Sequence, residues 1–206
     1  RAFDDSMMTL IEFPEGLETI GKAAFSTCRH ITAIDLPESL IKIGEEAFLG
    51  CGEVTELNIP SKLTVIPAHA FEECGKLTEL EIPANITAIE DSGFYQCGEL
   101  VTVHFNEGLK HLGREAFSYC KSLESADLPE GLESIGIYCF QHSEIKQVRL
   151  PNSLQRLGSN LYPVFDLEEV VFEGSEEEWA AIAGSDEAFF DDYSRTKMPI
   201  SMTFEP

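Results

Sequence analysis

The chain has 206 residues, of which 43% are hydrophobic and 25% are charged, a composition that predicts a folded core rather than a disordered chain. The 14 Lys and Arg residues stand against 37 Asp and Glu residues, so the formal net charge is −23. Such a charge repels nucleic acid and anionic membrane surfaces, and no apolar run approaches the roughly 18 residues of a membrane helix. Because the chain begins at Arg1, without Met or an apolar leader, we expect a fragment or a processed product.

A repeat of 22 or 23 residues runs through most of the chain. Cys recurs every 23 residues from Cys28 to Cys120. Phe also recurs once in each unit, with a first interval of 22 residues and five further intervals of 23, at Phe3, Phe25, Phe48, Phe71, Phe94, Phe117 and Phe140. A fixed period of this length is the signature of a solenoid.

The units follow the pattern L-x-x-I-G-x-x-A-F-x-x-C-x-x-L-x-x-I-x-L-P-x-x. A half-unit over 1–16 comes first, and further units begin at Leu17, Leu40, Leu63, Ile86, Leu109, Leu132 and Leu154. The second half of each unit alternates apolar and polar residues, as in Ile34-Asp35-Leu36, which predicts a half-buried strand. Stacked units would form one parallel sheet and one continuous core. The Ala-Phe segment lies opposite and is too short for more than a turn of α- or 3₁₀-helix, so we expect a solenoid of about eight β-rungs.

The period ends after Phe172, and the remaining residues predict a C-terminal cap over 173–206. Ser175 and Glu178 form the capping-box pattern of a helix start, and Trp179 to Ile182 supply an apolar face that Gly184 would end. Ile200 to Phe204 predict a closing strand. We therefore expect two parts, repeats over 1–172 with a partial first repeat, and a small α+β cap. The opposite end begins inside a repeat, so we expect further repeats upstream or a partner on that open end.

The signature from Ala24-Phe25 to Leu36-Pro37, with its equivalents in the other units, resembles the BspA-like class of bacterial leucine-rich repeats. The resemblance covers about 170 residues. It implies a right-handed superhelix in a bacterial cell-surface or secreted protein that adheres to host or matrix proteins. Four residues depart from the pattern, and we expect them to change local detail but not the fold: Ser143, Asn106, Pro67 and Glu90.

The cysteines invite a metal or disulfide interpretation, which their spacing does not favour. Residues 23 positions apart fall on successive rungs and face one way, whereas zinc needs four converging ligands and usually paired cysteines. Parallel Cβ vectors also make poor disulfides. We expect a column of buried free thiols from Cys28 to Cys120, with Cys139 buried at an Ala position.

One histidine lies among carboxylates on the predicted sheet. His104 occupies the polar position of its strand, and neighbouring rungs place Glu81 and Asp127 beside it. A metal site at this trio remains an alternative, but no nucleophile with an oxyanion donor accompanies it, so we expect no enzyme and no cofactor. The triplet Asn85-Ile86-Thr87 matches an N-glycosylation motif, yet Ile86 belongs to a core column, so we interpret the match as chance.

The sequence leaves two functions open besides the metalloprotein alternative. Exposed strand positions change from rung to rung while the core columns stay fixed, which suits recognition of a protein or glycoprotein partner, such as host extracellular matrix, on the concave sheet. A stiff spacer within a larger surface protein, without a ligand of its own, is the alternative. The candidate partner-binding residues are Glu79, Glu81, Thr102, His104, Asp127, Gln147 and Arg149.

Overall fold

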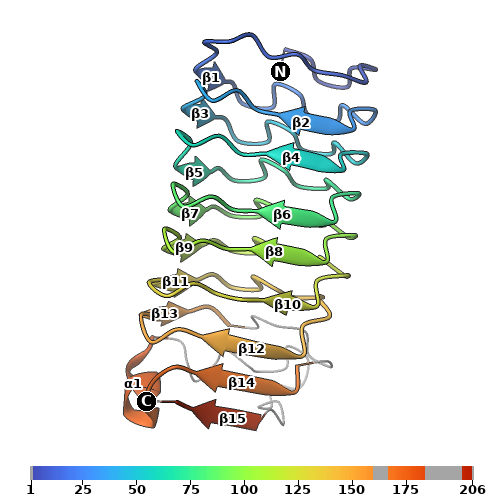
Figure 1. Cartoon of the computed structure of the whole chain (residues 1–206). Coiled ribbons are helices and arrows are strands. Elements are labelled where there is room, and N and C mark those ends of the chain that lie inside the picture. Colours follow the sequence, from blue (N-terminus) through green and yellow to red (C-terminus); the bar gives the residue numbers. More distant parts are fainter. Residues whose placement is uncertain (1, 160–166, 184–200, 206) are drawn as a thin grey trace.

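The computed structural model describes residues 2–159, 167–183 and 201–205. Its coils stack on one another in sequence order, with the N-terminal half-unit at one end and α1 and β15 at the other (Figure 1). The strand pairs are parallel. The predicted repeat solenoid is confirmed. Each coil has three sides, which we call the long-strand side, the short-strand side and the turn side.

The long-strand side forms the predicted parallel sheet. Its apolar residues point inward and its polar residues outward, as the alternation predicts. The pairing is interrupted twice, giving the groups β2-β4, β6-β8-β10 and β12-β14-β15. The strands are β2 (Ala33–Asp35), β4 (Glu56–Asn58), β6 (Glu79–Glu81), β8 (Thr102–His104), β10 (Ser125–Ala126), β12 (Gln147–Leu150), β14 (Glu169–Phe172) and β15 (Ser201–Phe204).

The short-strand side holds a second parallel ladder, which the sequence interpretation missed. Each strand has two residues, and the second is the buried Ile or Leu of the L-x-x-I element. The groups are β1-β3 and β5-β7-β9-β11-β13. These strands are β1 (Thr19–Ile20), β3 (Lys42–Ile43), β5 (Val65–Ile66), β7 (Ala88–Ile89), β9 (His111–Leu112), β11 (Ser134–Ile135) and β13 (Arg156–Leu157).

The turn side is built from the Ala-Phe segments, which form turns without a 3₁₀-helix in the described residues. In this turn two positions per coil have positive φ, for example His69 at 57° and Glu73 at 60°. A non-glycine residue is strained in this region, and hydrogen bonds to the next coil offset that strain. The N–H groups of His69, Phe71 and Glu73 donate to carbonyls of the following coil at 2.8–3.0 Å.

Two columns of side chains fill the core behind these turns. The Phe rings stack in sequence from Phe3 to Phe140 with centroids 5.2–5.7 Å apart and nearly parallel planes. All six cysteines are buried and free, as predicted. From Cys28 to Cys120, each thiol donates to the carbonyl of the Phe one coil earlier, as Cys97 Sγ does to Phe71 O at 3.4 Å. Burial raises the pKa of the Cys51 and Cys97 thiols to about 12, which keeps them protonated as donors.

The C-terminal elements cover the last coil. Helix α1 (Glu176–Ala181) begins with the predicted capping box between Ser175 and Glu178 and ends at Ile182. The Trp179 ring packs edge-on against Phe172 at 5.4 Å, and β15 pairs in parallel with β14. The predicted helix start and closing strand are confirmed, while Gly184 lies outside the described residues.

Candidate functional site

The candidate residues lie on the outer surface of the long-strand side, which we call the sheet face. Register pairing places Glu79 beside Thr102 and Glu81 beside His104 on β6 and β8. Asp127 follows β10 and forms a bridge with Arg149 of β12. Six of the seven candidate side chains are exposed and Thr102 is half-buried. The strands therefore bring the predicted residues onto one surface, and their role in binding stays a prediction.

The polar side chains of the sheet face contact one another between neighbouring coils. His104 Nε2 lies 3.2 Å from Glu79 Oε1, across a diagonal of the β6–β8 pair. Asn58 donates through Nδ2 to Asp35 Oδ1 at 3.1 Å, and Gln147 donates through Nε2 to Glu169 Oε2 at 2.5 Å. Exposed pairs of this kind contribute little to the stability of a fold. These side chains can therefore give up their contacts with one another for contacts with a partner at a small cost in free energy.

The basic end of the sheet face is paired with the C-terminal elements. Arg149 Nη1 lies 2.6 Å from Glu205 Oε2 and 3.3 Å from Glu173 Oε1. Hydrogen bonds to Glu205 and then Glu173 raise the pKa of the Arg149 guanidinium. These two carboxylates offset the positive charge of Arg149 on the sheet face.

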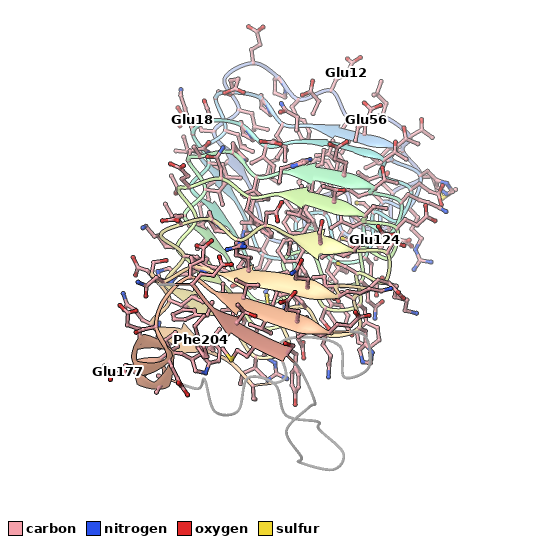
Figure 2. All side chains as sticks on the ribbon, turned by 60° about the horizontal axis from the view of Figure 1, so that its bottom comes forward. Glu12, Glu18, Glu56, Glu124, Glu177 and Phe204 are labelled. Carbon is pink, nitrogen blue, oxygen red and sulfur yellow. The ribbon has the colours of Figure 1, made fainter. Side chains whose placement is uncertain are left out.

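Three further glutamates join the same surface and were not among the predicted residues. Glu56 is the first residue of β4, Glu124 precedes β10 and Glu169 begins β14. Their positions in the repeat are equivalent to those of Glu79 and its neighbours, so the column alignment could have identified them. Figure 2 shows carboxylates on other parts of the molecule too, at Glu12, Glu18 and Glu177, so the acidic charge is not confined to one face.

The trio Glu81, His104 and Asp127 does not converge on a point. Within 2–159, 167–183 and 201–205, no group of three or more His, Cys, Asp or Glu side chains is arranged to hold a metal ion. The glycosylation-like triplet is also part of the framework. Asn85 donates through Nδ2 to the carbonyl of Pro60 at 3.1 Å and to that of Leu63, and Ile86 is fully buried.

Parallel coils with repeated Leu, Ile, Phe and Cys columns around one core define a leucine-rich-repeat solenoid. The family model for the BspA type leucine rich repeat region, in six copies, matches residues 1–124 and 64–189. The chain belongs to this family, and the resemblance drawn from the Ala-Phe-to-Leu-Pro signature is confirmed. Members are typically bacterial surface proteins, and such repeats are generally non-enzymatic protein-interaction modules.

Solved structures support the fold. A leucine-rich-repeat protein of T. pallidum shares 31% identity at a TM-score of 0.60, over 76% of this chain and 66% of that chain. A leucine-rich cell surface protein of Faecalibacterium prausnitzii shares 22% identity at a TM-score of 0.63, over 82% of this chain and 55% of that chain. The chain thus spans about two thirds or less of their lengths. The comparison with curated protein sequences gave no match. In the described residues no helix is long and apolar enough to cross a membrane.

Proposed function

We propose that the chain is a non-enzymatic binding module of a bacterial surface or secreted protein, and that it recognises a protein or glycoprotein through the sheet face. The observation that supports the proposal is the contrast between the two surfaces of one strand. The inward positions repeat, as in Leu80 and Val103, which are at most 3% exposed. The outward positions change from Glu81 to His104 to Asp127 on successive coils.

The proposal predicts that charge reversal on the sheet face abolishes binding. The test is a titration of the chain against a panel of extracellular-matrix and mucin glycoproteins, with the triple variant Glu81→Lys, His104→Lys and Asp127→Lys. These side chains are exposed, so the variant is expected to fold.

A matched control changes the charge equally on the short-strand side, with Glu18→Lys, His111→Lys and Glu133→Lys. Saturable binding that is lost in the sheet-face variant and kept in the control supports an adhesion module. Equal loss in both variants would indicate a general electrostatic effect and would contradict the proposed face. Absence of binding across the panel by a folded chain would contradict matrix or mucin adhesion and favour the spacer.

A further inference from the structure

The stacking of the coils is interrupted at one boundary on both strand sides. Strands β3 and β4 belong to the coil 40–62, and β5 and β6 belong to the coil 63–85. Neither β3 and β5 nor β4 and β6 pair, whereas the coils on either side of this boundary pair with their other neighbours. Figure 1 shows β4 and β6 set further apart than β6 and β8. Among the strands that the structure describes, the other interruption lies between β10 and β12, and it leaves the short-strand ladder continuous.

Individual backbone hydrogen bonds identify what is missing. On the short-strand side, the N–H of Thr87 donates to the carbonyl of Thr64 at 2.8 Å, but the equivalent donation from Thr64 to Ile41 is not made. On the long-strand side, the N–H of Val101 donates to Thr78 O at 2.9 Å, and again the equivalent donation from Thr78 to the coil 40–62 is not made. The two missing bonds lie on the same boundary.

Pro67 accounts for one bond that is missing on the short-strand side. In the next four coils the residue at this position donates its N–H to the Ile or Leu one coil earlier, as Glu90 does to Ile66 O at 2.8 Å. Proline has no N–H, so Ile43 O receives no bond from position 67, and the ring occupies a position where Gly is usual in this chain. We expected this departure to change only local detail, and instead it coincides with a break in both ladders.

The core is also looser at this boundary. Leu57 of β4 is half-buried, whereas its equivalents Ile34 and Leu80 are each 1% exposed. The contact from Cys74 Sγ to Phe48 O is 3.8 Å, and the other four thiol–carbonyl contacts of the column are 3.0–3.4 Å. A groove of about 700 Å³ runs along the short-strand side from β1 across β3 to Val65 and Pro67.

The turn side remains closed. The N–H groups of Glu46, Phe48 and Gly50 donate to carbonyls of the coil 63–85 at 2.8–3.1 Å, and Phe48 stacks on Phe71 at 5.5 Å. At the corner where the two coils are joined, Asn85 Nδ2 reaches Pro60 O. The two coils are therefore held along the turn side and at the corner where the chain passes between them, and they are unpaired along both ladders.

We propose that the boundary between the coils 40–62 and 63–85 is a hinge that divides the solenoid into two blocks, and that Pro67 is its cause. The opening is confined to the two strand sides, because the turn side and the corner between the coils keep their bonds while both ladders lack them. The open position also leaves the facing edges of β4 and β6 without strand partners. In a stack whose coils contact only their neighbours, a weak interface separates regions that open independently.

Amide hydrogen exchange of the intact chain tests the hinge without any substitution. Thr64 and Thr78 lie on the boundary, and Thr87 and Val101 occupy the equivalent positions one coil later with similarly exposed side chains. We expect the first two amides to exchange at least about tenfold faster than the second two. Equal protection of the two pairs would overturn the hinge.

The variant Pro67→Gly tests the cause. It restores the N–H and the residue that occupies this position in five other coils, so exchange at Thr64 should slow by about tenfold or more. Glu90→Gly is the control at the same position one coil later, where the N–H is already bonded, and it should leave exchange at Thr64 unchanged. Unaltered exchange at Thr64 in a folded Pro67→Gly variant would overturn the role of Pro67.

Discussion

The stacked Phe column predicts that Phe94→Ala will be strongly destabilising. Phe94 is fully buried and stacks between Phe71 and Phe117, with both centroid distances 5.4 Å and planes within 12° of parallel. These centroid distances lie within the range of about 4.5–7 Å over which aromatic pairs attract one another. Phe-to-Ala changes in a core cost about 3–5 kcal/mol, and each stacked pair adds about 0.5–1.5 kcal/mol beyond buried area. The core cost and the two lost stacked pairs together predict that the free energy of unfolding falls by about 4–8 kcal/mol.

The same column provides a matched control at its open end. Phe3 is 48% exposed and stacks on Phe25 alone, at 5.2 Å. Phe3→Ala should cost about 1–2 kcal/mol, because half of the side chain is already in water and one stacked pair is lost instead of two. The comparison holds the chemical change fixed and varies only the number of stacked neighbours and the burial.

Urea unfolding followed by circular dichroism at equal protein concentration measures both variants against the unmodified chain. Because coils of a solenoid interact only with neighbours, hydrogen exchange in the coil 86–108 should confirm that the loss is centred there. If the two variants lose free energies of unfolding within about 1 kcal/mol of each other, stacking and burial along the column do not determine the stability of a coil, and the reasoning fails.

Three further results are expected. Ser143→Cys should raise the free energy of unfolding by about 1 kcal/mol in urea under reducing conditions, because the buried Ser143 hydroxyl has no hydrogen-bond partner at a position where Cys donates to a carbonyl in other coils. Ser118→Cys is the control and should not stabilise the chain, because the Ser118 hydroxyl already donates a hydrogen bond. Iodoacetamide should modify six thiols in denaturant. In the folded chain it should react first with Cys28, which only the N-terminal half-unit covers. Rapid modification of all six thiols without denaturant would contradict the buried column. Hydrogen bonds from Ser175 lower the pKa of Glu178 below 4.5, so the contribution of Glu178 to the stability of helix α1 is complete above pH 4.5 and is lost as the pH falls through the lowered pKa. The fluorescence emission of Trp179, the only tryptophan, should therefore shift to the red at acid pH. The variant Glu178→Gln should remove the part of this shift that follows the titration of Glu178.

The period of 23 residues was enough to predict the long-strand sheet, the Phe and Cys columns and the order of the coils. Once Phe25, Phe48 and Phe71 are aligned, every other column follows, because identical coils can bury their apolar residues only by stacking in register. The start of the C-terminal helix was equally predictable, since Ser175 followed three residues later by Glu178 is the sequence pattern of a capping box.

Other features of the fold and of the sheet face could not be predicted from residue types. The short strands escaped because their apolar residues are three apart, as Leu63 and Ile66 are, which shows no period-2 alternation. The positive-φ turns escaped because residues such as His69 and Glu73 are not the usual signals of that conformation. On the sheet face, the pairing of Arg149 could not be predicted, because its partner Glu205 lies 56 residues later in the chain.

The hinge and the sheet face together give a final prediction about binding. All seven candidate residues, from Glu79 to Arg149, lie on coils that follow the hinge, so a partner confined to them contacts one block and gains nothing from closing the boundary. Pro67→Gly should then leave the Kd of any partner found in the panel within about twofold, which corresponds to about 0.4 kcal/mol. The titration used for the charge-reversal variant measures this directly. A change of about tenfold or more, 1.4 kcal/mol in free energy, would show that the partner also reaches Asp35 or Asn58 on the other block, and that opening of the hinge competes with binding.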